Sequence, residues 1–173
     1  MKETLKEATF KKHKEAERMP FNVKMFKGEL SEEEYLSHLN QQLAIFDSIE
    51  KLGLPDQSLS RIKPVQEDID ELKAKGFTSN KILKSTQEYC NYISSLNKDT
   101  VMPHIYLNYL AIMFGGQMMK SKVPSTGKMY DFEDSKKAMA AIRVFQKDEW
   151  ADEVNKGYEH IISIFRELEE ETV

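Results

Sequence analysis

The chain has few residues that could cross-link it or interrupt its helices. Its 173 residues include one cysteine, seven glycines and five prolines. The single cysteine, Cys90, excludes an intrachain disulfide framework and fits a reducing compartment. Long apolar runs are also lacking, because none approaches the roughly 18 residues that span a membrane, and the first residues contain no apolar signal core. We therefore expect a soluble cytoplasmic protein without a membrane anchor.

The charge balance excludes a further class of function. Lysine and arginine number 25 against 29 aspartate and glutamate residues, which gives a net charge of -4. Domains that bind nucleic acid usually carry a basic surplus, so the composition predicts no nucleic-acid partner. Hydrophobic residues make up 40% of the chain and charged residues 31%, as in ordinary globular proteins. The length is enough for one domain with a full core.

What the sequence does contain is helical periodicity. Apolar residues recur with the 3.6-residue period of an α-helix almost throughout the chain. Ser31 and Glu34 form a capping box that opens a long helix, and Gly53 and Pro55 end it. No segment shows the alternation of a half-buried strand. The pattern predicts an all-α protein with a single domain over residues 1–173, whose other helices lie at about residues 5–16, 64–75, 78–96, 101–119, 134–145 and 149–168.

The first candidate site residue is a histidine on the first expected helix. His13 has Thr9 and Glu17 at i-4 and i+4, so the three share one face. A carboxylate there can accept a hydrogen bond from the ring nitrogen that does not hold a metal, which fixes the tautomer. The histidines lack the spacing of a zinc site, whereas one helical histidine can hold heme. The alternative is a surface histidine in a helix rich in lysine and glutamate.

The second candidate feature is a pair of adjacent glycines. Gly115 and Gly116 interrupt the apolar run of residues 101–119. Each costs a helix roughly 1 kcal/mol relative to alanine, so the pair calls for an explanation. Close helix packing or a kink is one explanation. The other is that two missing side chains let the backbone approach a large flat ligand.

These two segments together resemble the heme oxygenase family. The first is similar to the family's helix that carries the iron-ligating histidine, and it contains Leu5, Lys6, Glu7, Thr9, His13, Ala16 and Glu17. The second is similar to the family's kinked helix on the other side of the heme, and it contains His104, Tyr106, Tyr109, Leu110, Gly115, Gly116 and Gln117. The resemblance implies a heme oxygenase-like helical fold with heme between these two helices.

The resemblance also implies roles for individual residues. His13 would be the axial ligand of the heme iron, and Glu17 would orient its ring. Gly115 and Gly116 would be the catalytic backbone positions that leave room for oxygen. The other implied contacts of heme are Lys6, Tyr106 and Arg143 at its carboxylates, Ile112 on the oxygen side and Phe165 as an apolar wall. Their alternatives are a solvated lysine, a core tyrosine, a surface arginine and plain core residues.

The sequence departs from the family pattern where oxygen would be activated. Ala111 stands in place of the first glycine of the kink, and Ile112 in place of an aspartate whose water network delivers a proton. Asn108 and Ile161 replace an arginine and an asparagine of the same region. Isoleucine can neither donate nor accept a hydrogen bond. We expect water held by backbone carbonyls near the glycine pair, or by Tyr106 and Gln117, to take over this role.

The activity that the resemblance implies is oxidative opening of heme to biliverdin, with release of iron and carbon monoxide. Heme is then both substrate and cofactor, a reduced ferredoxin or a similar donor supplies electrons, and a bilin reductase is a further downstream partner. Ile112 favours a first alternative, a heme-binding or heme-carrying protein of the same fold without efficient ring cleavage. A second alternative is a related helical protein that binds another ligand or serves as an interaction module.

Overall fold

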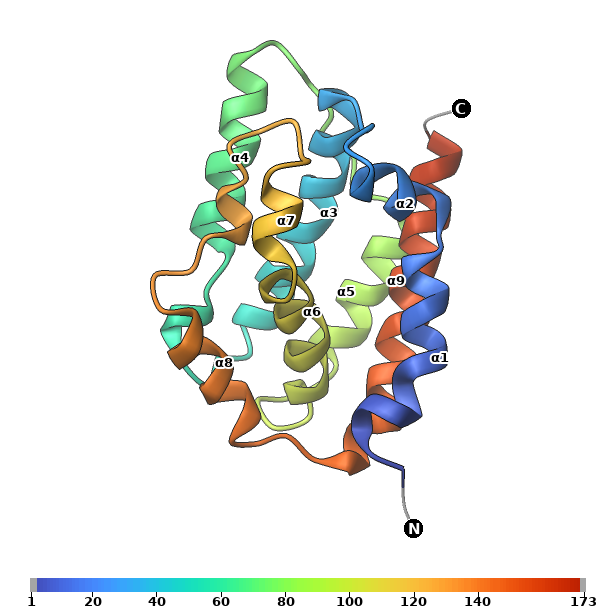
Figure 1. Cartoon of the computed structure of the whole chain (residues 1–173), viewed down its shortest axis with the longest axis vertical. Coiled ribbons are helices and arrows are strands. Elements are labelled where there is room, and N and C mark those ends of the chain that lie inside the picture. Colours follow the sequence, from blue (N-terminus) through green and yellow to red (C-terminus); the bar gives the residue numbers. More distant parts are fainter. Residues whose placement is uncertain (1–2, 172–173) are drawn as a thin grey trace.

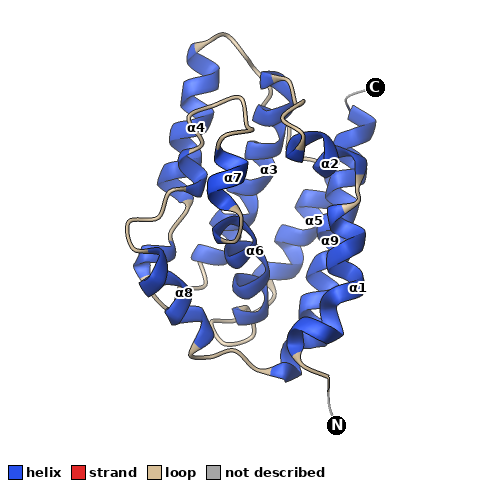
Figure 2. Cartoon of the chain, viewed as in Figure 1, coloured by secondary structure: helices blue, strands red, loops and turns tan. Residues whose placement is uncertain are grey.

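The computed structural model describes residues 3–171 and confirms the all-helical prediction for them, because this range contains helices and no strand (Figure 2). Three short 3-10 helices, η1 (Gln57–Leu59), η2 (Lys128–Tyr130) and η3 (Asp148–Trp150), lie between α-helices. In the same range no helix is long and apolar enough to cross a membrane. The α-helices are α1 (Leu5–Glu17), α2 (Pro20–Phe26), α3 (Glu32–Glu50), α4 (Ile62–Ala74), α5 (Lys84–Ser94), α6 (Met102–Met113), α7 (Gly116–Lys120), α8 (Ser135–Arg143) and α9 (Ala151–Glu171).

Helices from opposite parts of the sequence pack side by side. α1 lies along α9, while α6 crosses the middle of the molecule in front of α3 and α5 (Figure 1). Thr4 and Glu7 form a capping box at the start of α1, which the sequence analysis did not single out. The buried stripe of α1, Leu5, Thr9 and Ala16, faces the protein and leaves the opposite stripe exposed.

The main core forms around α3. The predicted capping box of Ser31 and Glu34 is present, and α3 packs against both α4 and α5. Its inward side chains meet those of α4, α5 and α6 in one apolar cluster. Burial of this kind stabilises a fold by roughly 25 cal/mol for each Å² of apolar surface. The largest fully buried side chains of the cluster include Tyr35, Leu36, Leu39, Phe46, Leu72, Tyr89 and Tyr109.

One predicted helix starts later than expected. The sequence predicted a helix from residue 78, but α5 begins at Lys84. The reason is that side-chain amides of α3 bind the preceding backbone. Asn40 donates to the carbonyl of Ser79 at 2.8 Å, while Gln41 donates to the carbonyl of Lys81 at 2.8 Å and accepts from the backbone N–H of Leu83 at 3.0 Å. These bonds hold residues 79–83 outside a helix.

The helix predicted over residues 101–119 is two helices. α6 ends at Met113, Phe114 is extended, and Gly115 adopts a left-handed conformation with φ of 70°. A left-handed residue ends an α-helix, and glycine adopts this conformation without the steric cost of a β-carbon. The glycine pair therefore breaks the helix and does not merely bend it. A second helix that was not predicted, α2, starts with Pro20 in its first turn.

The irregular connection after α7 is fastened by two buried charged side chains. Arg61 donates from its guanidinium to the backbone carbonyls of Met129 at 2.9 Å and Asp131 at 2.7 Å. Asp68 accepts from the backbone N–H groups of Lys128 at 3.0 Å and Met129 at 2.9 Å. Residues 128–131 are thus tied to α4 from both sides of η2. These bonds hold η2 in place against α4 and α7.

Candidate functional site

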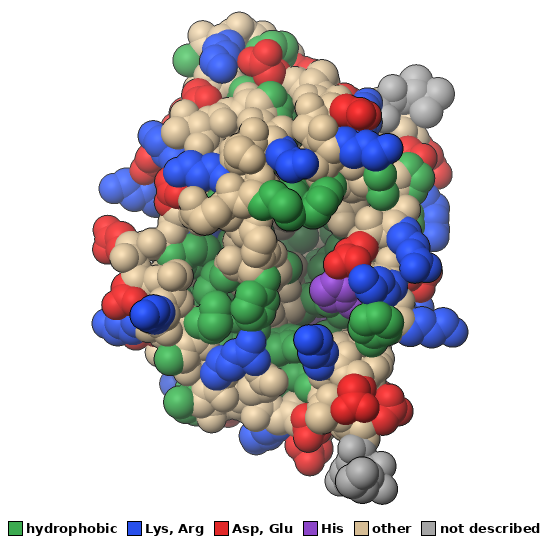
Figure 3. Space-filling model, in the orientation of Figure 1, with side chains coloured by type: hydrophobic (Ala, Val, Ile, Leu, Met, Phe, Trp, Pro, Cys, Tyr) green, Lys and Arg blue, Asp and Glu red, His purple; other side chains and the backbone are tan. Residues whose placement is uncertain are grey.

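The exposed face of α1 carries four side chains at helical spacing. Lys6, Phe10, His13 and Glu17 follow one another at intervals of three or four residues, so they line one side of the helix. All four are exposed, and Phe10 leaves 53% of its surface to solvent. The surface is hollowed between the region of α1 and that of α6 and α7, with a histidine at the edge of the hollow (Figure 3). α1 thus presents an imidazole, an aromatic ring and charged groups beside this hollow.

Both ring nitrogens of His13 are hydrogen-bonded. Its Nε2 lies 2.6 Å from the carboxylate of Glu17, as the spacing of four residues predicted. Its Nδ1 lies 3.0 Å from the hydroxyl of Tyr158, which comes from α9. The side chains of His13 and Glu17 remain 47% and 50% exposed. The ring is therefore oriented from two sides, while about half of its side chain stays open to solvent.

Glu17 faces His13 as a carboxylate. Partial burial acts to raise the pKa of Glu17, but hydrogen bonds from His13 and Lys14 and their positive charges outweigh it and lower that pKa. Lys14 contacts the second carboxylate oxygen at 3.2 Å. An ionised carboxylate only accepts hydrogen bonds. The ring nitrogen that faces Glu17 therefore carries the proton.

The opposite side of the hollow is formed where α6 ends. Ala111 and Phe114 are exposed there, and Phe114 leaves 53% of its surface to solvent. A β-carbon on Gly115 would have no other atom within 4 Å, so this glycine borders open space. A β-carbon on Gly116 would lie 3.5 Å from the ring of Tyr130, so this glycine faces the interior. The two glycines of the pair thus have different surroundings, which the sequence analysis did not distinguish.

The residues that replace the family's polar groups offer nothing polar to the hollow. Ile112 is 7% exposed and belongs to the main apolar cluster, against which Ile161 also packs. The side-chain amide of Asn108 donates to the hydroxyl of Tyr89 at 3.0 Å and to the carbonyl of His104 at 2.9 Å. Its amide N–H groups are therefore used within the protein, by Tyr89 on α5 and by the backbone of α6.

Two of the residues predicted to bind the heme carboxylates lie near each other. Burial raises the pKa of Tyr106, and the nearby positive charge of Arg143 acts against this rise. The Arg143 guanidinium lies 5.6 Å from the centre of the Phe114 ring and donates to Gln146 at 3.1 Å. Lys6 is exposed on α1. A cationic guanidinium thus lies beside the end of α6, a tyrosine lies in the first half of that helix, and a lysine lies on the exposed stripe of α1.

Phe165 lies in an aromatic layer of the interior. It is 9% exposed, and its ring stacks at 6.2 Å on Phe21 and at 6.3 Å on His38. Burial lowers the pKa of His38 to about 4, so its ring is neutral at neutral pH. Phe165 therefore joins α9 to α2 and α3 in the interior.

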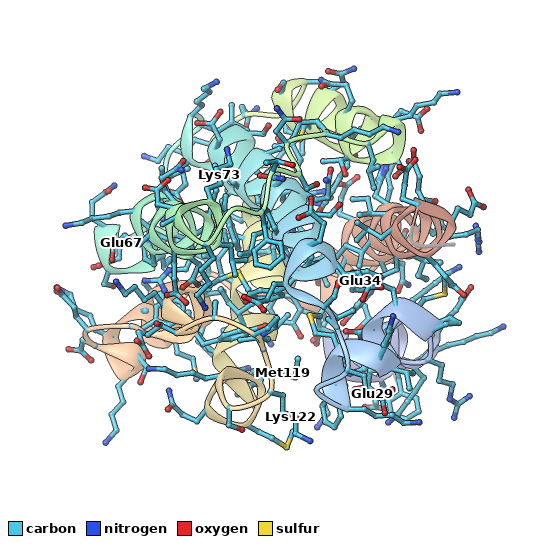
Figure 4. The ribbon with its side chains drawn as sticks, turned by 90° about the horizontal axis from the view of Figure 1, so that it is seen from above. Glu29, Glu34, Glu67, Lys73, Met119 and Lys122 are labelled. Carbon is cyan, nitrogen blue, oxygen red and sulfur yellow. The ribbon has the colours of Figure 1, made fainter. Side chains whose placement is uncertain are left out.

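The end of the hollow near α7 is closed by contacts between distant segments. The ammonium of Lys122 lies 5.4 Å from the ring centre of Phe26, and a β-carbon on Gly28 would touch the carbonyl of Lys122 at 3.4 Å. Seen from above, the segment with Met119 and Lys122 lies beside the corner of the chain that carries Glu29 (Figure 4). The corner after α2 thus meets the segment after α7.

The residue that sequence reasoning missed is Tyr158. It lies three residues before Ile161 and seven before Phe165, so the helical spacing placed it on their face of α9. Gly157 precedes it where α9 meets α6, and a β-carbon there would lie 2.5 Å from the side chain of Leu107 and 3.1 Å from that of His104, so a larger residue would force these side chains to shift. Burial raises the pKa of Tyr158, as do Tyr106 and Glu17, so its hydroxyl is neutral.

Comparison with known proteins gives the same fold. Heme oxygenase-1 of the cyanobacterium Synechocystis, solved in complex with heme, superposes with a TM-score of 0.83 at 20% identity, over 96% of this chain and 91% of that one. The heme oxygenase of Leptospira interrogans superposes with a TM-score of 0.81 at 22% identity, over 94% of this chain and 97% of that one.

Comparison of sequences points the same way. Heme oxygenase 2 of Macaca fascicularis is 23% identical over 208 aligned positions, which include 98% of this chain. The chain spans only 66% of the length of that relative. The model of the heme oxygenase family matches residues 1–155, which is most of the chain. By its sequence and its helical fold, the chain belongs to the heme oxygenase family.

Proposed function

We propose that this protein binds heme in the hollow between α1 and the end of α6 and opens the ring oxidatively to biliverdin, with release of iron and carbon monoxide. The observation that carries the proposal is the exposed stripe of α1. Its imidazole is held by a carboxylate one turn away, and Gly115 borders open space on the other side of the hollow. Family membership supports the same activity.

The residues of the hollow fit heme in kind and in placement. Heme is a flat apolar ring with a central iron and two carboxylates at one edge. His13 supplies a ligand of the type that iron takes in many heme proteins. Phe10 and Phe114 are large apolar side chains that are exposed in the absence of a ligand, and covering such surface is favourable. Lys6, Tyr106 and Arg143 supply two cations and a hydroxyl for carboxylates.

When bound, heme supplies the iron at which oxygen is activated and the ring that is oxidised. The chain's own residues position it and exclude water. His13 would hold the iron, and Glu17 would accept a hydrogen bond from the imidazole, which raises the basicity of the ligand. Gly115 and Gly116 are proposed as the catalytic backbone positions, because the break between α6 and α7 leaves open space at Gly115 that oxygen would use.

Protons must reach the site without the usual side chain. Ile112 cannot hold water, and Asn108 is engaged elsewhere. The last carbonyls of α6 are the acceptors that remain, since those at the end of a helix lack partners within it. We infer that they hold the water that delivers protons, with Tyr106 and Gln117 as further partners. Phe165 contributes an apolar support behind the site.

Further parts of the proposal concern the setting of the reaction. Heme is substrate and cofactor, a reduced ferredoxin or a similar protein is the electron donor, and a bilin reductase is a downstream partner. The protein acts in the cytoplasm as a single domain over residues 1–173. These statements extend from the resemblance to soluble, biliverdin-producing members of the family.

One specific observation favours a second candidate function, a heme carrier without efficient ring cleavage. The polar groups that deliver protons in the family are replaced by Ile112, by Ile161 and by an Asn108 whose amide is directed at α5. A pocket of this kind can hold heme and oxygen without advancing the reaction, because oxygen activation needs proton transfer.

The decisive experiment combines the protein with heme, oxygen and a ferredoxin reducing system. Ring opening predicts loss of the Soret band and the appearance of biliverdin. His13→Ala serves as the matched control, because it lacks the side chain proposed to bind the iron. A Soret band that persists through repeated reduction, with no biliverdin, would favour the carrier. Absence of any heme-dependent Soret band would reject both functions.

A further inference from the structure

Large apolar side chains gather on the segments around the hollow. Among the described residues, seven such side chains are exposed, and six of them lie on α1, α2 and α7, at the end of α6 or just after α8. The exception is Ile82, on the segment before α5. Phe10 and Phe114 belong to the proposed heme contacts. The other four, named the apolar rim, are Phe26, Met118, Val144 and Phe145.

Two members of the apolar rim lie at the end of the hollow near α7. The ring of Phe26, at the end of α2, has the ammonium of Lys122 5.4 Å from its centre. Met118 lies on α7. Phe26 and Met118 each leave about half of their surface to solvent. They therefore form an exposed apolar contact at the place where the segments after α2 and α7 meet.

The other two members lie beside the end of α6. Val144 and Phe145 follow Arg143, whose guanidinium lies 5.6 Å from the centre of the Phe114 ring. Val144 leaves 77% of its surface to solvent, more than any other exposed apolar side chain of the described residues. Hydrophobic side chains lie on several sides of the hollow, with lysine and arginine side chains among them (Figure 3). Exposed apolar surface gathered in this way marks a contact with another molecule or with a membrane.

The lysines of the same segments are not neutralised by acids. In the part of the chain that the structure describes, Lys27, Lys122 and Lys147 form no ion pair with a carboxylate. By contrast, Lys120 on α7 pairs with Asp131 at 2.6 Å. A lysine stem can lie on apolar surface while its ammonium group stays in water. The apolar rim is thus accompanied by positive charge that has no counterpart within the protein.

An anionic lipid surface matches this combination. Aromatic and aliphatic side chains enter the headgroup region of a bilayer, and lysines are attracted to its anionic headgroups. A protein partner would need a contiguous apolar core of complementary shape, but the apolar rim is divided between segments on different sides of the hollow. A bilayer requires no such match, because lipids rearrange around separate side chains.

We propose that the apolar rim docks this protein reversibly on an anionic membrane surface, with the hollow turned towards the lipid. The four apolar side chains enter the headgroup region, and Lys27, Lys122 and Lys147 contact lipid phosphates. One consequence rests on the proposed function: heme, a largely apolar ring that partitions into bilayers, enters the hollow from the lipid side.

Sedimentation with vesicles tests the docking without heme. The native protein should bind vesicles of phosphatidylcholine and phosphatidylglycerol in equal parts, and it should dissociate as the salt concentration rises. Replacing both Val144→Ser and Phe145→Ser should lower this affinity by about 10-fold or more, because apolar side chains that enter the lipid are lost. Ile82→Ser is the matched control and should bind like the native protein. No binding by the native protein, or an equal loss in the two variants, would overturn the proposal.

A second comparison tests the charges. Lys122→Gln should lower the affinity for the mixed vesicles about 5-fold, the effect of one lysine near an anionic surface. Lys73→Gln is the matched control, because Lys73 is exposed on α4 and lies on the opposite side of the molecule from Met119 and Lys122 (Figure 4). Equal losses in these two variants would mean that the attraction has no preferred face, against the proposal.

The same variants distinguish a membrane from an acidic protein partner. If the native protein ignores the vesicles but binds a ferredoxin, and the rim variants weaken that binding, the apolar rim is a protein interface and the membrane proposal fails. If the rim variants lose vesicle binding as expected while the native protein takes up no heme, the docking stands and the proposed function fails.

Discussion

On the α1 side of the hollow, His13 and Glu17 leave about half of their side chains exposed and still bond to each other and to Tyr158. On the α6 side, the polar groups of Asn108 and Tyr109 are buried and bond away from the hollow, to Tyr89 and Glu50. The wall formed by α1 thus keeps its polar atoms at the surface, whereas the wall formed by α6 uses them in hydrogen bonds that stabilise the interior. Of these two sets of polar groups, only the pair on α1 remains open to solvent.

The largest effect should follow from removing the imidazole of the α1 wall. His13→Ala should abolish the spectrum of histidine-ligated heme. Affinity should fall by more than about 100-fold, the upper range for losing a residue that only supports a metal ligand. Absorption titration with heme measures this, and free imidazole should partly restore the spectrum. His160→Ala is the control, and an unchanged spectrum in His13→Ala would assign the ligand to another residue.

The next test concerns the aromatic layer of Phe21, His38 and Phe165. It asks whether this layer contributes to stability alone or also to heme binding. The pKa of His38 is lowered by burial from 6.5 to about 4. The folded protein therefore binds fewer protons than the unfolded chain between these pH values. The contribution of neutral His38 to the unfolding free energy is complete above pH 6.5 and is lost as the pH falls towards 4. With about 1.4 kcal/mol for each pH unit, the full loss is about 3 kcal/mol.

Substitution of His38 isolates this contribution. His38→Phe keeps a ring beside Phe21 and Phe165 but cannot bind a proton. Its unfolding free energy should therefore fall less than that of the native protein as the pH is lowered. Denaturant unfolding of both proteins between pH 7 and pH 4 measures the difference. A constant difference across this range would show that the pKa of His38 is the same in the folded and unfolded states. A loss of heme affinity would place the layer in the site.

The α6 wall can be tested by restoring the group that it lacks. Ile112→Asp puts a carboxyl group among apolar side chains, so the unfolding free energy should fall by about 1–3 kcal/mol. Ala111→Asp is the matched control, because the neighbouring position is exposed and should lose much less. We expect the native protein to make biliverdin and Ile112→Asp to retain this activity. No biliverdin from the native protein with a competent donor would contradict the proposed chemistry of this wall.

The smallest effect concerns the break between α6 and α7. Gly115→Ala places a β-carbon at a φ of 70° and should cost about 1–2 kcal/mol in unfolding free energy. Gly53→Ala is the control, because that glycine also has a positive φ and open space around it. Only Gly115→Ala should weaken heme binding as well. Equal heme affinity in the two variants would make the break a packing device.

Local patterns predicted the parts of this structure that depend on neighbours in sequence. The bond between His13 and Glu17 follows from a spacing of four residues, and the capping box at Ser31 from a spacing of three. The late start of α5 was not predictable in this way, because side chains about 40 residues away bind its preceding backbone. Tyr158 escaped notice for the same reason, since its contact with His13 exists only once α1 and α9 are paired.

The sequence also could not predict whether the helix bends or breaks between α6 and α7. Two adjacent glycines predicted an interruption, but a kink and a break have the same sequence signal. The outcome depends on the left-handed conformation of Gly115 and on Tyr130, which packs against Gly116 from a segment that Arg61 and Asp68 hold in place. The family resemblance supplied the fold as a whole, while these tertiary contacts decide the local geometry.

The packing of α1 against α9 also bears on the order of events during protein synthesis. A ribosome makes α1 early and α9 more than a hundred residues later. Until α9 has emerged, His13 has no Tyr158 beside it and the buried stripe of α1 has no partner helix. A nascent chain therefore displays a histidine on an unsupported helix, and the contact between His13 and Tyr158 can form only after translation has passed residue 158.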